Sequence, residues 1–252
     1  MRGAVPKILL ITGGSRGIGA ATARLAAQRG YTICITYLHN KVAAEAIVAD
    51  IIKSGAQAHA IATDICVERE VTQLFKHLDT HVGSVTALVN NAGILDQQMR
   101  VDQMNAERLQ RIFTTNIVGP FLCAREAVRR MSTRYGGIGG AIVNVSSGAA
   151  LLGAPGEYVD YAASKGAIDS FTIGLAKEVA LEGIRVNAVR PGVIYTDMHA
   201  SGGEPHRVDR VKAAVPMQRG GQADEVAHAI LWLLSDEASY ITGACLDVTG
   251  GR

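Results

Sequence analysis

The stretch ILLITGGSRGIG, residues 8–19, decides the fold of this chain. Four consecutive branched apolar residues predict a short buried strand that ends at Thr12-Gly13. The glycines that follow have the spacing G-x-x-x-G-x-G, which permits a tight turn before a helix begins at Gly17. Glycines also let backbone N–H groups approach a pyrophosphate beside the positive end of the helix dipole. The stretch therefore predicts a strand, a turn and a helix that together bind a nucleotide, although an ordinary glycine turn would show the same letters.

Beyond this stretch, short apolar runs alternate with longer amphipathic ones. Strands that are apolar throughout and separated by helices indicate a parallel sheet covered on both faces. The predicted fold class is α/β: a single-domain, doubly wound parallel sheet of the Rossmann-like kind, with helices on both faces and ligands beyond the carboxyl ends of the strands. The predicted strands are 8–11, 31–37, 56–61, 85–89, 141–145, 184–190 and 244–248, and the predicted helices are 17–29, 41–53, 68–81, 105–134, 158–182 and 223–235.

Residues 192–222 form the one long irregular stretch, and they are rich in glycine, proline and charge. Irregular stretches of this length in a compact domain are often functional. We expect residues 192–222 to act as a substrate lid within a single domain that spans residues 1–252.

Length and composition exclude several classes of protein. The chain has 252 residues, enough for one large domain, and 25 basic against 23 acidic residues give no electrostatic footprint for nucleic acid. No apolar run approaches the ~20 residues that span a membrane, and the N-terminus shows no signal peptide. The four cysteines lack C-x-x-C spacing, which is typical of small core residues in a reducing compartment, so we expect a cytoplasmic protein. His77 and His81 could supply half a metal site, but a third ligand with suitable spacing is missing, so we expect a solvated helix face and no metal.

Tyr161 and Lys165 are four residues apart in a predicted helix, where they share one face. A phenol with a reference pKa near ~10 is a poor base at neutral pH, but a nearby ammonium favours phenolate and lowers that pKa. Tyrosine and lysine are also common on exposed helix faces. Here they accompany a glycine turn, a Ser146-Ser147 pair and Asn116, so we interpret them as a proton-transfer group.

The end of the second predicted strand bears on the choice of cofactor. A dinucleotide fold often places an acid about 20 residues after the glycine turn, on the ribose hydroxyls. Neither Asp nor Glu occurs between Gly13 and Asn40, whereas Arg16 lies in the turn and His39 and Lys41 lie near the expected ribose site. This pattern favours the 2′-phosphate of NADP(H) over NAD(H), although His39 and Lys41 could simply begin a solvated helix.

Together these motifs resemble the short-chain dehydrogenase/reductase family over essentially the whole chain. The resemblance implies an NAD(P)(H)-dependent oxidoreductase that acts on a carbonyl or secondary alcohol of a small molecule by hydride transfer. Within the family, the sequence looks most like glucose 1-dehydrogenases and 3-oxoacyl-carrier-protein reductases. The segments that carry the resemblance are Thr12-Gly13, Arg16-Gly17-Ile18-Gly19, Asn90-Asn91-Ala92-Gly93, Asn116, Ser147, Tyr161, Lys165 and Pro191-Gly192.

The resemblance also implies a catalytic set. Tyr161 would exchange a proton with the substrate oxygen, while Lys165 would lower the phenol pKa and bind the nicotinamide ribose. A serine would donate to the substrate oxygen; Ser146 and Ser147 are both available, and we choose Ser147, with 13 residues between it and Tyr161. That gap looks one residue longer than in most relatives.

Asn116 matches the family asparagine that joins the lysine to solvent through a water. Pro120 follows four residues later and lacks the N–H that would bond the carbonyl of Asn116. In a continuous helix this carbonyl would be free to hold a water, and the competing interpretation is a kink without a role.

The implied cofactor contacts begin with Asn91, Ala92 and Gly93 on the adenosine side. Asp64 would accept from the adenine amino group, or else cap a helix. The segment 191–194 would cover the nicotinamide, with Thr196 reaching its amide or a phosphate. The whole implied set is Gly13, Ser15, Arg16, Gly17, Ile18, Gly19, Asp64, Asn91, Ala92, Gly93, Tyr161, Lys165, Pro191, Gly192, Ile194 and Thr196.

Family resemblance further implies a homo-oligomer, with a tetramer expected, in which helices 105–134 and 158–182 pack against their copies. An acidic carrier protein as partner would need a basic rim, which Arg129, Arg130 and Arg134 could supply, although Glu182 weakens that idea.

Two alternatives remain. Tyr158 lies seven residues before Lys165, which is the spacing of enoyl reductases that reduce a carbon–carbon double bond, but the intact glycine turn favours carbonyl chemistry. We expect Tyr158 to line the pocket one turn away. The other alternative is a non-catalytic NADP(H) sensor, a class that typically loses the tyrosine or the lysine, both of which this chain retains.

Overall fold

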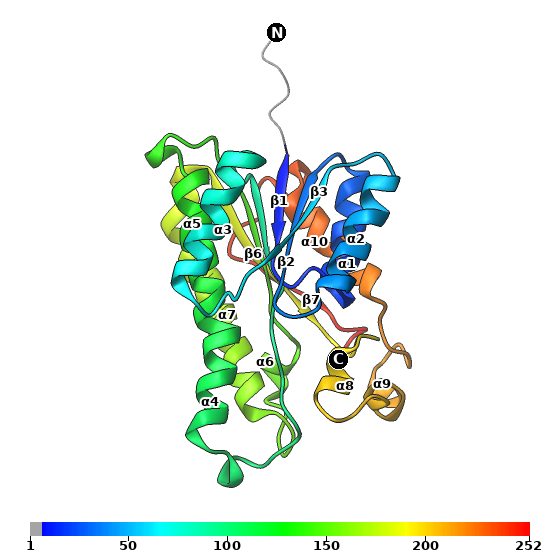
Figure 1. Ribbon diagram of the computed structural model, residues 1–252. Helices are drawn as coiled ribbons and strands as arrows, with labels where there is room; N and C mark the ends of the chain where they lie inside the picture. Colours follow the sequence, from blue (N-terminus) through cyan, green and yellow to red (C-terminus); the bar gives the residue numbers. More distant parts are fainter. Residues whose placement is uncertain (1–6) are drawn as a thin grey trace.

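The computed structural model describes residues 7–252, and across them it forms one sheet of seven parallel strands. The strand order is β3-β2-β1-β4-β5-β6-β7 (Figure 1). The chain therefore adds β2 and β3 on one side of β1, and then adds β4 to β7 on the other side. This confirms the predicted doubly wound α/β fold and places the topological switch point between β1 and β4. The strands are β1 (Ile8–Ile11), β2 (Thr32–Tyr37), β3 (Ala58–Ala62), β4 (Ala87–Asn90), β5 (Gly140–Val145), β6 (Ile184–Pro191) and β7 (Cys245–Val248).

Helices cover both faces of the sheet because alternate strand residues point to opposite sides. Leu9 and Ile11 join one buried apolar cluster, whereas Ile8 and Leu10 join the other. In Figure 1 the two helical layers lie to the right and left of the sheet. One layer holds α1 (Gly17–Gln28), α2 (Lys41–Lys53) and α10 (Ala223–Leu234), and the other holds α3 (Glu68–His81), α5 (Gly119–Met131) and α7 (Val159–Val179).

The predicted helical stretch over 105–134 is confirmed as unbroken helix over residues 106–131, but its geometry is not α-helical throughout. The structure contains α4 (Ala106–Phe113), a π-helical turn (Thr114–Val118) and then α5. In the π turn the N–H of Gly119 donates to the carbonyl of Thr114, five residues back instead of four. Pro120, which has no N–H, follows directly as the second residue of α5 (Gly119–Met131). The carbonyl of Asn116 therefore does not lie in a regular α-helix, and the expectation built on that geometry does not apply.

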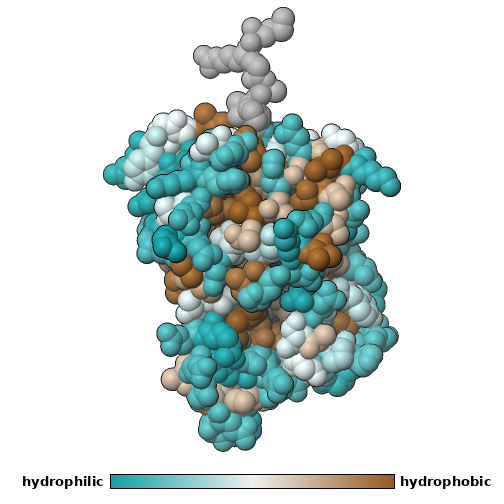
Figure 2. All heavy atoms as spheres, viewed as in Figure 1, coloured by the Kyte–Doolittle hydropathy of each residue, from teal (hydrophilic) through white to brown (hydrophobic). Residues whose placement is uncertain are grey.

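Residues 192–222 lie beyond the carboxyl ends of the strands and are partly helical, with α8 (Met198–Ser201) and α9 (Arg207–Val211) (Figure 1). The end of this segment is hydrogen-bonded to its beginning. The carbonyl of Gly221 accepts from the N–H of Tyr195 at 2.9 Å, and its N–H donates to the carbonyl of Val193 at 2.9 Å. On the face in Figure 2, hydrophobic residues are visible in the hollow between this segment and the part of the molecule that holds α4. Within residues 7–252, no helix has both the length and the apolar character that a membrane crossing requires.

Candidate active site

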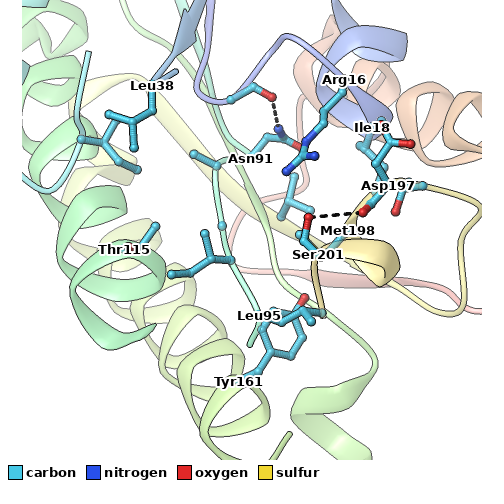
Figure 3. A pocket seen from close by; sticks show the side chains of 18 of the residues that line it. Arg16, Ile18, Leu38, Asn91, Leu95, Thr115, Tyr161, Asp197, Met198 and Ser201 are labelled. Carbon is cyan, nitrogen blue, oxygen red and sulfur yellow. Dashed lines mark hydrogen bonds between the residues drawn. The ribbon is translucent and has the colours of Figure 1, made fainter. Parts of the chain in front are cut away.

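A cavity of about 960 Å³ opens at the carboxyl ends of the central strands, where the fold predicts a ligand. It reaches from the turn after β1, past the ends of β2 and β4, to α7 and the segment 192–222 (Figure 3). Such a volume suits a dinucleotide together with a small substrate better than a metabolite alone. Its lining includes these predicted site residues: Gly13, Ser15, Arg16, Gly17, Ile18, Asp64, Asn91, Ala92, Gly93, Ser147, Tyr161, Lys165, Pro191, Gly192, Ile194 and Thr196.

The glycine turn is shaped by close backbone approaches. A Cβ on Gly14 would lie 2.4 Å from the Ile35 side chain, and one on Gly19 would lie 2.5 Å from the carbonyl oxygen of Gly13. Gly13 and Gly17 both have positive φ, at 65° and 53°. The turn therefore tolerates no side chain at these positions, and its bare backbone faces the cavity at the start of α1. These features fit the pyrophosphate of a dinucleotide.

Asn91 supports the glycine turn from β4. Its Nδ2 donates to the carbonyls of Thr12 and Gly13, each at 2.9 Å (Figure 3). The Thr12 hydroxyl in turn accepts from the backbone N–H groups of Asn91 and Ala92, each at 3.0 Å. The Asn91 side chain is thus engaged in holding the turn, a role that its implied place on the adenosine side did not anticipate.

Two of the basic residues that the sequence placed near the cofactor, Arg16 and His39, line the cavity. Arg16 begins α1 and extends along the cavity wall toward Asn91 (Figure 3). His39 also lines the cavity, whereas Lys41 lies outside the lining and approaches Glu45 at 3.5 Å. Asn40 caps α2 by accepting from Ala43 at 3.0 Å. Of the two basic residues near the second strand, only His39 faces the cavity, and Lys41 belongs to a solvated helix.

Asp64 lines the cavity beyond β3, and its Oδ1 accepts from the N–H of Cys66 at 2.8 Å. The residue that caps α3 is Val67, so Asp64 closes a turn before the helix instead of capping it.

The opposite end of the cavity is built from buried side chains. Lys165 Nζ donates to the carbonyl of Val145 at 2.8 Å, and Asn116 is fully buried behind it. A Cβ on Gly93 would lie 3.3 Å from Asn116 Oδ1 and 3.4 Å from Lys165 Nζ, so both polar groups converge on this glycine. The side chain of Asn116 forms two hydrogen bonds with the backbone of Ile94. Its Oδ1 accepts from the N–H at 2.8 Å, and its Nδ2 donates to the carbonyl at 2.9 Å. The π turn thus presents Asn116 to the loop after β4.

Tyr161 points into this end of the cavity, next to Leu95 (Figure 3). Burial raises the pKa of Tyr161 to about 12, and a hydrogen bond with the Ser147 hydroxyl opposes that rise. Burial lowers the pKa of Lys165 to about 8, partly offset by Asp169. Desolvation therefore outweighs the expected lowering of the phenol pKa by Lys165, whose ammonium lies 5.6 Å from the ring centroid.

The two candidate serines have different surroundings. Ser147 lies near enough to Tyr161 to lower the pKa of its phenol, and its hydroxyl accepts from the N–H of Ala149 at 3.1 Å. Ser146 is buried, and its hydroxyl donates to the carbonyl of Lys165 at 3.1 Å. Ser146 therefore supports α7, and Ser147 is the serine beside the phenol.

Tyr158 does not line the cavity, contrary to our expectation. It is buried, its hydroxyl donates to the carbonyl of Gly202 at 3.4 Å, and the guanidinium of Arg207 lies 5.0 Å from its ring centroid. It therefore packs beneath residues 192–222 and faces away from the reacting end. Spacing alone could not show this, because the residue precedes α7.

The segment after β6 encloses the cavity near Tyr161. Gly192 donates to the carbonyl of Val248 at 2.9 Å, and a Cβ there would lie 2.8 Å from Thr249 Cα. Thr196 reaches back to the glycine turn, where a Cβ on Gly17 would meet its methyl group at 3.3 Å. Three residues of α8 also line the cavity, Met198, His199 and Ser201, and the sequence did not predict them because no motif marks this segment.

The arginines proposed as a basic rim lie at the wrong end of the molecule. The carbonyl of Met131, at the end of α5, accepts from Gly139 at 2.7 Å, just before β5 begins. Arg129 and Arg130 are thus near the amino ends of the strands, where they pair with Glu126. Nor do residues 7–252 contain a cluster of three or more His, Cys, Asp or Glu arranged for a metal ion.

Comparisons with known proteins agree with this geometry. A family model described as Enoyl-(Acyl carrier protein) reductase matches residues 13–252. The chain is 60% identical to an uncharacterized oxidoreductase of Escherichia coli, YgfF, over 97% of this chain and 99% of that protein. It is 37% identical to a 3-oxoacyl-[acyl-carrier-protein] reductase of Synechocystis, over 97% of this chain and 96% of that protein.

Two solved structures resemble this chain over almost its whole length. A mutant short-chain dehydrogenase/reductase from Serratia marcescens superposes with a TM-score of 0.89 at 31% identity, covering 97% of each chain. A blue fluorescent protein from a metagenomic library, solved in complex with NADPH, has a TM-score of 0.89 at 33% identity and also covers 97% of each chain.

Proposed function

This chain belongs to the short-chain dehydrogenase/reductase family, and we propose that it catalyses NADP(H)-dependent interconversion of a carbonyl group and a secondary alcohol on a small molecule. One observation carries the proposal. Tyr161, Ser147 and Lys165 meet at one end of a cavity whose other end is a glycine-rich turn at a helix N-terminus.

The residues of the chain divide the chemistry between them. When bound, NADP(H) supplies or accepts the hydride. Tyr161 gives a proton to the substrate oxygen during reduction, and its pKa of about 12 keeps it protonated at neutral pH. Ser147 donates to the same oxygen, and the positive charge of Lys165 stabilises the phenolate left after the proton has moved. The carbonyl of Val145 accepts from Lys165 Nζ at 2.8 Å and so keeps this ammonium beside the cavity.

The proposed preference for NADP(H) rests on positive charge at the glycine-turn end of the cavity. Arg16 lines the cavity at the start of α1, and the lining at the end of β2 contains His39 and Asn40 but no carboxylate within the described residues. A guanidinium suits a phosphate group, whereas the NAD ribose usually meets an acid. The structural relative with NADPH is consistent with this choice.

Reduction of a carbon–carbon double bond through Tyr158 is the weaker alternative. The hydroxyl of Tyr158 is engaged by Gly202 and the residue is outside the cavity lining. A non-catalytic sensor is also disfavoured, because the acid, its serine partner and the lysine are all present and adjacent.

The substrate we propose is a free small molecule, with residues 192–222 acting as its lid. On the lid face of the cavity, Met198 supplies an apolar side chain, and His199 and Ser201 supply polar ones. Two arginines in this part of the molecule are paired with acids, since Arg111 contacts Asp96 and Arg207 pairs with Glu157 at 2.5 Å. This arrangement offers little to a large acidic carrier.

We also propose a homo-oligomer, with a tetramer expected, in the cytoplasm. Phe121 of α5 and Phe171 of α7 stack at 3.7 Å between ring centroids, and Val118, Phe121 and Ile173 are partly exposed on these helices. An apolar surface of this kind suits a symmetric interface. Light scattering at micromolar concentration tests the assembly. All four cysteines are free thiols, as expected in a reducing compartment.

The test of function is a panel of ketones, aldoses and acyl thioesters assayed with NADPH and with NADH. We expect oxidation of NADPH with at least one carbonyl substrate and a smaller kcat/KM with NADH. Tight NADPH binding without turnover on any carbonyl would favour the sensor, and turnover confined to enoyl substrates would favour double-bond reduction.

A further inference from the structure

A buried ion pair lies directly behind Tyr161. Arg108 of α4 donates from Nε to Asp160 Oδ2 at 2.7 Å and from NH2 to Asp160 Oδ1 at 3.4 Å. The two side chains are 5% and 1% exposed. Burying two charges is costly unless their geometry is well satisfied, and such pairs are weak contributors to net stability. Their presence next to the reacting tyrosine therefore calls for a reason other than stability.

Asp160 connects this pair to the tyrosine itself. It lies in the first turn of α7, and its Oδ1 also accepts from the N–H of Tyr161 at 2.9 Å. First-turn N–H groups have no partner within their helix, so this bond fixes the backbone from which the phenol projects. A negative charge at this position is also favoured by the helix dipole.

Arg108 connects the same pair to the facing wall of the cavity. Its NH1 donates to the carbonyl of Gln97 at 2.7 Å. Gln97 belongs to the loop after β4, whose residues Ile94 and Leu95 line the same cavity as Tyr161 (Figure 3). One guanidinium thus joins α4, the start of α7 and the loop that carries the opposite wall.

We propose that Arg108 and Asp160 are positioning residues that set the distance between the Tyr161 hydroxyl and the substrate held against the 94–97 wall. The inference rests on the proposed function, because it assigns the pair to the proton transfer that Tyr161 performs. The planar guanidinium holds Asp160 and the Gln97 carbonyl at once, which the single ammonium of a lysine cannot do. Errors of about 1 Å in such placement cost about 10²-fold in rate.

The experiment compares Arg108→Met, Arg108→Lys and Asp160→Asn with the wild-type enzyme. We expect kcat per NADPH-titrated site to fall about 10²-fold in Arg108→Met and less in Arg108→Lys, with the NADPH Kd unchanged within about twofold. The primary isotope effect measured with NADPH deuterated at the transferred position should increase, since proton and hydride transfer become slower than product release.

Arg130→Lys is the matched control. Arg130 is a largely buried arginine that binds Asp79 and Glu126 near the amino ends of the strands, away from the cavity. Its substitution should lower thermal stability while leaving kcat per site and the isotope effect unchanged.

The possible outcomes separate the two proposals. Wild-type enzyme without carbonyl turnover would refute the proposed function. Wild-type turnover combined with unchanged kcat per site and isotope effect in the folded Arg108 or Asp160 variants would refute the positioning role. If Arg108→Met does not fold, Arg108→Lys decides, because it retains the buried charge.

Discussion

The two ends of the cavity hold their shape in different ways. At the turn end, residues 13–19, the backbone is kept in place by glycines too crowded for a side chain and by the Asn91 bonds. At the tyrosine end, around Tyr161 and Lys165, buried side chains hold one another and desolvation shifts their pKa values. Substitutions at the turn end should therefore act on cofactor binding and stability, and those at the tyrosine end on proton transfer.

The largest effect is expected from Tyr161→Phe. Removing the hydroxyl abolishes the transferable proton while leaving the ring packing intact, so kcat should fall about 10²–10⁴-fold with NADPH affinity preserved. Steady-state kinetics and isothermal titration measure the two quantities.

Tyr158→Phe is the control, because Tyr158 is outside the cavity lining and bonds only the Gly202 carbonyl at long range. It should cost little activity. A nearly silent Tyr161→Phe beside an inactive Tyr158→Phe would reverse the assignment and favour double-bond reduction.

Arg16→Ala tests the turn end. A charge-assisted hydrogen bond is worth about 1.5–3 kcal/mol, so NADPH binding should weaken by roughly 10- to 150-fold. NADH binding, measured by the same titration, should change little because it lacks the 2′-phosphate. Equal losses for both cofactors would contradict the role of Arg16 in selecting NADPH.

Gly19→Ala and Gly166→Ala form a matched pair within helices. A Cβ on Gly19 would lie 2.5 Å from a backbone oxygen and 2.6 Å from Asn91 Nδ2, whereas one on Gly166 would have no neighbouring atom within 4 Å. Forced overpacking costs typically about 1–3 kcal/mol, so Gly19→Ala should lower the free energy of unfolding by that amount. Gly166→Ala should leave it unchanged or raise it by up to about 1 kcal/mol. Denaturant unfolding compares them, and equal stabilities would mean that the turn is not tightly packed.

The smallest expected effect is a pH dependence at the tyrosine end. Burial lowers the pKa of Lys165 to about 8, so its positive charge is present below pH 8 and is lost as the pH rises through that value. The pKa of Tyr161, about 12, keeps the acid protonated throughout this range. Accordingly, kcat/KM for carbonyl reduction should be flat below pH 8 and about tenfold lower by pH 9.

Lys165→Arg tests whether the loss of charge on Lys165 causes this fall in kcat/KM, because a guanidinium remains charged over the whole pH range. Its residual activity should lack the decline near pH 8. If kcat/KM of Lys165→Arg still fell near pH 8 as in the wild-type enzyme, the fall would belong to the titration of another group.

Local patterns in the sequence predicted much of this molecule correctly. The apolar runs located all seven strands within two residues at either end, since a strand buried on both faces must be continuously apolar. The glycine spacing predicted the turn, because only glycine permits its positive φ angles and close approaches. The four-residue separation of Tyr161 and Lys165 placed both on one helix face, and both line the cavity.

Tertiary structure alone decided the rest. The π turn at Asn116, the place of Tyr158 under residues 192–222 and the pairing of Arg108 with Asp160, 52 residues away, depend on which segments pack together. The same is true of the pKa values, because the sequence shows an ammonium near a phenol but not how much water each loses on burial. Periodicity records what each residue does within its own helix or strand, whereas desolvation and contacts between distant segments exist only once the chain has folded.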